Sequence, residues 1–185
     1  MKNDTIKTKH LIITTNGSWT DKWVVMEQEC GKIIGSLVFE SAPINNEVKV
    51  AIDFDDEYIN NEFAVEAINA AIDKAFKMDS KLYFVIAEAE QNNTALKNTL
   101  ENLGFKKYFE SENIIKYDFE RPSSDWFVFY MCIGMSMGTA IALYLGNIVM
   151  GSGLGMSVGV CVGLILDKYE KKKKDDVRNL RINQK

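Results

Sequence analysis

The chain has 185 residues, of which 26 are acidic and 22 basic, so its formal net charge is −4. This average hides two unlike parts: residues 1–125 carry 22 acidic and 14 basic side chains (net −8), and residues 167–185 carry 4 acidic and 8 basic (net +4). An acidic head excludes the clustered Lys and Arg that nucleic acid binding needs. Three cysteines without metal-ligand spacing indicate neither a disulfide framework nor a metal site, and the polar first ten residues do not resemble a signal peptide.

The first 120 residues predict one compact α/β domain with its own core. Four segments alternate apolar with polar residues or are rich in β-branched side chains, and turn-forming residues such as Asn16-Gly17-Ser18 and Cys30-Gly31 separate them. They predict strands at 11–15, 23–27, 32–40 and 48–54, of which the second and third form a hairpin.

The hydrophobic period changes after these strands. Apolar residues recur at intervals of three and four between Asn61 and Met78, which predicts an amphipathic helix. A continuous apolar strand at 82–87 is of the kind buried on both faces. The remaining elements expected in chain order are a helix at 94–103 that ends at Gly104, and two strands at 105–109 and 113–119.

A different composition begins at Trp126. From there to Leu166 the chain runs 41 residues without a charge, and this stretch holds eight of the twelve glycines. One continuous helix would be about 60 Å long, roughly twice the hydrocarbon core of a bilayer. We therefore expect two membrane spans, 126–145 and 148–166, after a linker at 121–125. The alternative is a glycine-rich hairpin buried in a soluble core.

Small residues fall at every fourth position along both spans. A soluble helix loses about 0.8–1 kcal/mol for each interior glycine relative to alanine, so this spacing needs a packing reason. In a membrane, small residues four apart let two helix backbones approach closely. We expect the two stripes to face each other in an antiparallel hairpin, or to face neighbouring copies in a homo-oligomer. The stripes consist of Gly134, Gly138, Ala142 and Gly146, then Gly151, Gly155, Gly159 and Gly163.

The tail at 167–185 sets the expected topology. The positive-inside rule places its basic residues in the cytoplasm, next to the anionic leaflet, and a hairpin returns the head to the same side. We expect a two-span protein of the inner (cytoplasmic) membrane, with the lipid bilayer as partner and both termini in the cytoplasm. The basic residues that carry this prediction are Lys168, Lys171, Lys172, Lys173, Lys174, Arg178 and Arg181.

The order of elements in the head, together with certain residues, resembles the GNAT acetyltransferase family, particularly its ribosomal-protein and small-molecule branches. The resemblance covers about residues 10–120 and implies a mixed central sheet with two main helices (α+β). The residues that carry it are Gly-Lys-Ile-Ile-Gly at 31–35, the strand and helix from Val48 to Phe76 with Tyr58, Ala64, Glu66 and Ala67, and Asn93 eleven residues before Gly104-Phe105.

The resemblance also implies a cofactor and its place. Acetyl-CoA would lie where the strands at 48–54 and 82–87 separate, with its pyrophosphate on backbone N–H groups at the start of the first helix, whose dipole favours an anion. No metal is implied. The residues that this arrangement places at the cofactor are Ile52, Asp53, Phe54, Asn60, Asn61, Glu62, Phe63 and Asn93.

The chain departs from the family at the phosphate loop, which usually reads Gln/Arg-x-x-Gly-x-Gly/Ala. Here Asn60 and Glu62 occupy the two glycine slots, and the basic or glutamine position is not recovered. Glycine lets the backbone approach phosphate closely, whereas Glu62 adds a negative charge beside a doubly charged group. An acid in the first turn of a helix also has an ordinary role, because it stabilises the helix dipole.

Other parts of the family's active site are reduced as well. The tyrosine that commonly acts as general acid is replaced by Leu100, and only about eight residues, including Trp19 and Asp21, stand where two acceptor-binding helices are usual. His10, the only histidine, is expected at the surface. The catalytic residues stay unassigned, and the acids that could take a proton from an amine are Glu47, Asp53, Asp55 and Glu88, each more often a solvated carboxylate.

Three hypotheses follow from the sequence. The first is a GNAT-like head with weak or lost N-acetyltransferase activity that serves as a binding or sensing module on a membrane anchor. The second is an active, membrane-tethered acetyl-CoA-dependent N-acetyltransferase. The third is a glycine-zipper oligomer or pore that the head regulates. They differ in what the head binds.

Overall fold

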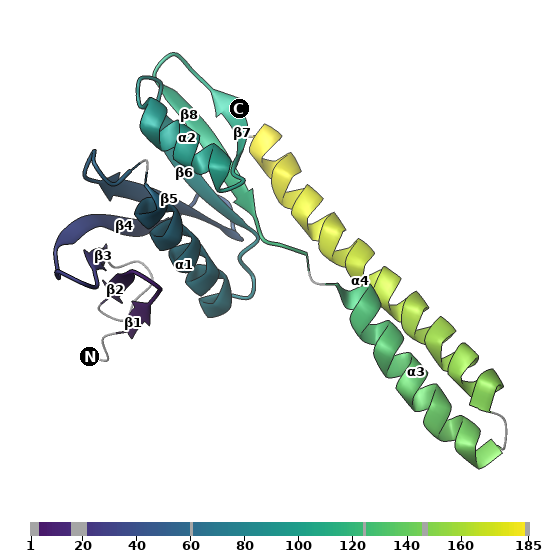
Figure 1. The fold of residues 1–185 in the computed structure, drawn as a ribbon. Coiled ribbons are helices and arrows are strands. Elements are labelled where there is room, and N and C mark those ends of the chain that lie inside the picture. Colours follow the sequence, from purple (N-terminus) through teal and green to yellow (C-terminus); the bar gives the residue numbers. More distant parts are fainter. Residues whose placement is uncertain (1–3, 16–21, 60, 124, 146–147, 184–185) are drawn as a thin grey trace. The chain divides into compact units, whose positions relative to one another are not determined.

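The computed structural model describes residues 4–15, 22–59, 61–123, 125–145 and 148–183. The chain divides into two compact units, Met1–Arg121 and Pro122–Lys185. We call the first unit the head and the second the hairpin, and each is described by itself (Figure 1).

In the described part of the head, eight strands form one sheet in the order β1-β2-β3-β4-β5-β6-β8-β7. Neighbouring strands are antiparallel except for β5 and β6, which are parallel and are connected by helix α1. The strands are β1 (Asp4–Lys7), β2 (Leu11–Thr15), β3 (Lys22–Glu27), β4 (Ile33–Ser41), β5 (Glu47–Phe54), β6 (Phe84–Glu90), β7 (Lys106–Glu110) and β8 (Ile114–Glu120). The helices are α1 (Glu62–Met78) and α2 (Thr94–Asn102).

Helices α1 and α2 lie side by side on one face of the sheet (Figure 1). Their buried side chains join the inward-facing residues of the strands in a single core. On α1 the buried positions recur at intervals of three and four, many of them alanine, so the helix packs closely on the sheet. The mixed α/β fold expected from the sequence is confirmed.

The predictions for individual elements differ from the structure at the edge strand β1 and at the interior strand β6. Strand β1 is not predicted, so five strands rather than four precede α1. Its sequence is polar because it is an edge strand that pairs only with β2. Strand β6 begins two residues later than predicted and continues to Glu90, because it pairs with β8 along its whole length. Gly104 follows α2 with φ = +88°, as a helix end requires.

The hairpin consists of α3 (Trp126–Leu145) and α4 (Ile148–Asn183). Both helices are long and apolar enough to cross a membrane. The tail at 167–185 is expected as a separate segment, but α4 continues through it to Asn183. Its lysines favour a helix, and Lys174 forms an ion pair with Glu170 one turn earlier at 3.2 Å.

The small residues of the two helices face each other within the chain. A Cβ atom added to Gly138 would lie 2.8 Å from the Cα of Gly155, and one added to Gly134 would lie 3.0 Å from the Cα of Gly159. Gly151 packs against Ala142, and Gly163 against Phe127. Gly146 lies outside the described residues. Of the two arrangements left open by the sequence, the structure has the stripes in mutual contact.

The contact between the glycines predicts that a larger side chain on α4 destabilises the hairpin where it faces α3 and has no effect where it faces away. Gly155→Leu forces side-chain atoms into the backbone of α3 and should lower the free energy of unfolding by about 1–3 kcal/mol. Double electron–electron resonance between spin labels on the exposed Cys132 and Cys161, with Cys30 replaced by serine, should report a longer and broader distance.

Gly153 supplies the control, because nothing lies within 4 Å of a Cβ atom added there. Gly153→Leu should leave the distance between the labels unchanged. Equal responses of the two variants would contradict the packing of α3 against α4 through the glycine stripe.

Strands β1 and β2 are tied to α1 through one carboxylate. The backbone N–H of His10 donates to Glu66 Oε1 and its ring Nδ1 lies 2.9 Å from Glu66 Oε2, so this histidine is bonded rather than free at the surface. Partial burial raises the pKa of the Glu66 carboxyl, but the hydrogen bonds from Thr8 and His10 outweigh it and leave the pKa below its usual value.

The contribution of Glu66 to the stability of the fold therefore depends on pH. Because its folded-state pKa lies below its unfolded value, this contribution is present above about pH 4.5 and is lost as the pH falls through the folded-state pKa. Urea unfolding should show Glu66→Gln less stable than wild type by about 1 kcal/mol at pH 7, with a smaller difference at lower pH. A difference that is constant with pH would contradict this account, and the exposed Glu112→Gln serves as control.

Candidate functional site

The parallel strands β5 and β6 separate partway along their length. Their pairing runs from Glu47 opposite Phe84 to Val50 opposite Ala87. Beyond that point, residues 51–54 of β5 continue along β4, and residues 88–90 of β6 continue along β8. We call this opening the fork. In the described residues the two arms do not pair with each other beyond that point. Backbone N–H and C=O groups are the donors and acceptors that an extended chain of amides needs.

Gly35 shapes the β5 arm of the fork. It lies in the neighbouring strand β4, opposite Phe54 of β5. A Cβ atom placed on Gly35 would come within 2.7 Å of the Asp53 carbonyl oxygen and of the Phe54 ring. The absence of a side chain at Gly35 therefore lets the Phe54 ring pack against β4. Gly35 belongs to the Gly-Lys-Ile-Ile-Gly segment at 31–35, in which nothing in the sequence indicates this contact.

The loop at 55–61 connects the β5 arm to α1 and is held by its own hydrogen bonds. The carbonyl of Asp55 accepts from the N–H groups of Tyr58 and Ile59 at 2.8 and 3.2 Å. Asn61 is the N-cap residue of α1, but its side chain donates to the carbonyl of Glu57 at 2.7 Å and does not cap the helix. The first N–H groups of a helix have no intrahelical partner. Because the Asn61 side chain does not bond to these groups, it does not compete with a ligand for them.

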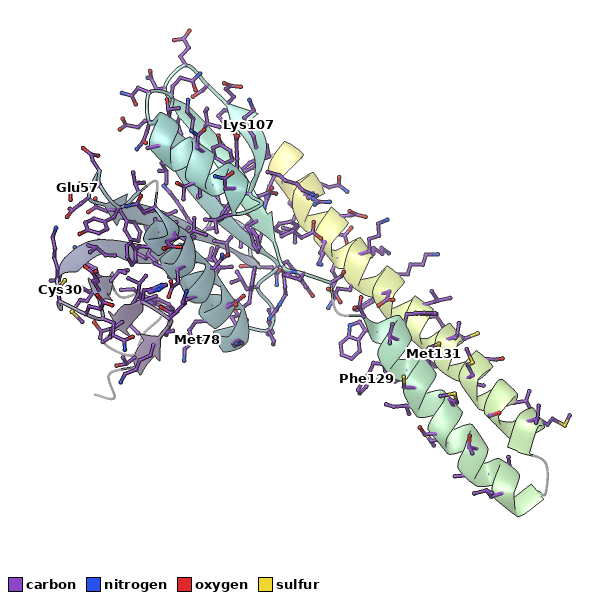
Figure 2. The ribbon with its side chains drawn as sticks, in the orientation of Figure 1. Cys30, Glu57, Met78, Lys107, Phe129 and Met131 are labelled. Atoms are coloured by element: carbon purple, nitrogen blue, oxygen red, sulfur yellow. The ribbon has the colours of Figure 1, made fainter. Side chains whose placement is uncertain are left out.

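The charge around the start of α1 is mainly negative. Asp55, Asp56, Glu57 and Glu62 are all exposed, and Figure 2 shows Glu57 at the opposite end of α1 from Met78. One cation from the β3–β4 turn lies here, as Lys32 Nζ donates to the Tyr58 hydroxyl at 3.3 Å and lies 5.0 Å from its ring centroid. The hydrogen bond to Tyr58 raises the pKa of Lys32, so its ammonium stays charged.

The helix that follows the β6 arm is joined to this loop. Asn93 caps α2 through its side-chain oxygen, which accepts from Leu96 N–H at 2.9 Å. Further along α2, the Thr99 hydroxyl donates to the carbonyl of Ile59 at 2.6 Å, in a buried position. Thr99 was not singled out from the sequence, because a hydroxyl in the middle of a helix gives no signal of its partner.

The structure gathers most of the expected cofactor residues at the fork. Ile52 is half-buried, Asp53 exposed and Phe54 buried along the β5 arm, and Asn61, Glu62 and Phe63 follow at the start of α1. Asn93 follows the β6 arm, and Asn60 lies outside the described residues. The fork therefore unites residues from two parts of the chain, and two of them are exposed acids, Asp53 on the β5 arm and Glu62 at the first position of α1.

The candidate bases differ in position and environment. Glu88 is the first residue of the β6 arm, and its carboxylate lies 2.8 Å from Lys49 Nζ and 3.2 Å from Lys116 Nζ. Partial burial raises the pKa of Glu88, but the hydrogen bonds from Lys49 and Lys116 outweigh it and keep the pKa below its usual value. Glu88 is therefore a poor proton acceptor. Glu47 begins β5, at the end away from the fork, whereas Asp53 and Asp55 are exposed at the fork end.

Two further parts of an acetyltransferase site are reduced. Leu100 has no hydroxyl to donate to a leaving thiolate, and its side chain is fully buried in the core. Strand β2 ends at Thr15 and β3 begins at Lys22, so six residues, 16–21, stand where the family resemblance implies two acceptor-binding helices, against about eight expected from the sequence. Those residues lie outside the described part of the chain. Among the described residues, no group of three His, Cys, Asp or Glu is placed to hold a metal ion.

Comparisons with known proteins agree with this geometry. The family model described as an acetyltransferase (GNAT) domain matches residues 3–106. A GNAT-family acetyltransferase from Bacillus anthracis superposes with a TM-score of 0.53 at 16% identity, over 63% of this chain and 98% of that one. An acetyltransferase from Agrobacterium tumefaciens gives 0.52 at 13% identity, over 65% and 96%. A comparison with curated proteins gives no significant match.

The family match covers more than half of the chain, and the structural neighbours share its fold. The forked sheet and the two helices on one face are therefore those of a known acetyltransferase domain, and this chain belongs to the GNAT family.

Proposed function

We propose that this protein is a membrane-anchored GNAT-fold binding or sensing module, whose head takes the pantetheine part of an acyl-CoA into the fork and has weak or lost N-acetyltransferase activity. The observation that carries the proposal is the contrast between an open fork and an acidic loop beside it. Acetyl-CoA, when bound, would supply the thioester to be transferred. The chain's own groups hold and orient it.

The fork fits the pantetheine arm. Pantetheine is an extended chain with two amides, and the arms of the fork offer backbone donors and acceptors beyond Val50 and Ala87. Phe54 and Ile52 add apolar surface on the face covered by the helices. These backbone donors and acceptors are therefore suited to pantetheine, and no charged side chain is needed to bind it.

The phosphate end of acetyl-CoA fits less well. Two like charges 4–6 Å apart repel by about 3–4 kcal/mol at an effective dielectric constant of 20, and less when solvent and salt screen them. Glu62, Asp55 and Glu57 all place negative charge near the start of α1, against one ammonium from Lys32. We infer that the phosphates add little to the affinity of the head.

Catalysis has weak support from the same residues. Deprotonating an amine requires a group whose pKa suits the task, whereas Glu88 is held as a carboxylate by two lysines. The exposed Asp53 on the β5 arm is the observation that keeps an active N-acetyltransferase as the second candidate. The oligomer or pore has less support, because the glycine stripe is already occupied within the chain.

The hairpin is proposed as the anchor. Large apolar side chains of α3 and α4 are exposed, among them Leu143, Val149 and Ile165, and a bilayer would cover them. At the open end of the hairpin the Trp126 indole N–H donates to Glu170 at 3.1 Å, where an aromatic ring and a polar partner suit a membrane interface. We infer an inner-membrane location with both termini in the cytoplasm.

The contrast between fork and loop predicts how the head ranks its ligands. The full chain in lipid nanodiscs, titrated calorimetrically, should bind acetyl-CoA and acetyl-pantetheine, which lacks the adenosine phosphates, with affinities within about threefold. Both dissociation constants should lie in the range of about 0.1–1 mM. Acetyl-CoA binding tighter by about a hundredfold would favour the active enzyme, and no heat with either ligand at millimolar concentration would overturn the proposal.

A charge variant provides the matched control for this titration. Glu62→Gln keeps the shape of the side chain and should tighten acetyl-CoA binding by about tenfold, while acetyl-pantetheine binding stays the same. Glu112→Gln removes an exposed charge in the β7–β8 turn and should change neither affinity. If Glu62→Gln has no effect on acetyl-CoA, the acidic loop does not limit binding.

The proposed topology makes a labelling prediction. Cys30 is exposed in the head, and a bulky membrane-impermeant maleimide should label it in a variant that retains this cysteine alone, but only after the cell membrane is opened. A cysteine introduced at Lys185 should behave in the same way. Labelling of either site in intact spheroplasts would contradict a hairpin with both ends in the cytoplasm.

A further inference from the structure

The hydrogen bond between Thr99 and Ile59 joins two elements that are far apart in the sequence. The Thr99 hydroxyl donates to the Ile59 carbonyl at 2.6 Å, and both residues are buried. A threonine inside a helix ordinarily donates to the carbonyl four residues earlier in its own helix. Thr99 instead donates out of α2 to a loop, which a buried leucine or alanine with better helix propensity could not do.

The backbone of the loop is attached to the sheet at its first residue, where the Asp55 N–H donates to the Ile34 carbonyl of β4 at 3.2 Å. The bonds of the Asp55 carbonyl and of Asn61 described above connect the loop to itself. The Ile59 side chain lies in the core, and its carbonyl is the acceptor for Thr99. The position of this carbonyl therefore determines where the loop runs relative to α2.

The bond also connects the continuations of the two arms of the fork. The β5 arm leads into the loop that contains Ile59, and the β6 arm leads through Asn93 into α2, which carries Thr99. The two arms are separate beyond Val50 and Ala87, so no strand pairing fixes their spacing there. A cross-connection between the elements that follow them supplies this restraint.

We propose that Thr99 is a positioning residue that holds the fork at the width a thioester ligand requires. Its hydroxyl touches no ligand and acts through the Ile59 carbonyl. The inference rests on the proposed function, in which the pantetheine arm lies between β5 and β6. Without the bond the loop loses its hydrogen bond to α2, and part of the binding energy is used to order the loop.

Conservative variants separate this role from a merely structural one. Thr99→Val keeps the shape and removes the hydroxyl, whereas Thr99→Ser keeps the hydroxyl. As a matched control, Tyr117→Phe removes a hydroxyl that donates from β8 to Glu101 of α2 at 3.2 Å, outside the loop and the arms. Thermal unfolding of all variants in nanodiscs establishes that they are folded and gives their loss of stability.

Binding of acetyl-pantetheine to the full chain is the first readout. Thr99→Val should weaken it by about fivefold, the loss of one buried hydrogen bond. Thr99→Ser should stay within about twofold of wild type, and Tyr117→Phe should bind as wild type even if it loses as much stability. Equal weakening by Thr99→Val and Tyr117→Phe, or none by Thr99→Val, would overturn the proposal.

Hydrogen exchange of the loop is the second readout and needs no ligand. The N–H groups of Tyr58, Ile59 and Asn61 are hydrogen-bonded, and Thr99→Val should accelerate their exchange while Thr99→Ser does not. If the wild-type chain binds no thioester, the proposed function fails, and this exchange still decides whether Thr99 holds the loop. Unchanged exchange in Thr99→Val would refute the restraint itself.

Discussion

The crossover from β5 through α1 to β6 is the constraint on which the rest of the head depends. It makes these two strands parallel neighbours in an otherwise antiparallel sheet, and their pairing stops at Val50 and Ala87. Each arm keeps an antiparallel partner on its outer side, so the fork opens without leaving either strand unsupported. The same crossover brings the start of α1 to the open end. Fork and helix terminus thus follow from one connection.

The two halves of this site have different chemical characters. The fork depends on backbone groups and on the close contact of Gly35 with Phe54, so it tolerates wide changes in sequence. Affinity for phosphate depends on side-chain charge and on glycine in the loop, and here Glu62 stands at the first position of α1. A head that keeps the fold can therefore keep its affinity for one part of a ligand and lose its affinity for another part, since fold alone does not determine function.

Sequence patterns predicted the elements in which buried residues recur at regular intervals along the chain. The amphipathic α1 and the apolar β6 follow from spacing alone, whereas the polar β1 has no such signal because it is an edge strand of the sheet formed by the described residues. The fork was expected only through a family resemblance, since strand separation leaves no mark in composition. Long-range hydrogen bonds such as those of Thr99 and His10 were not predictable, because each depends on a partner some forty or more residues away.

Glycines permit close packing in both parts of this chain, in addition to the conformational role of Gly104 at the end of α2. In the head, Gly35 admits one aromatic ring. In the hairpin, the alternation of Gly134 and Gly138 with Gly155 and Gly159 brings α3 and α4 together along one line. Van der Waals contact between close backbones drives helix association in lipid, and within this chain that contact accounts for the four-residue spacing of the described stripe glycines. In the proposed membrane anchor, the exposed large apolar side chains of the hairpin form the surface that lipid covers.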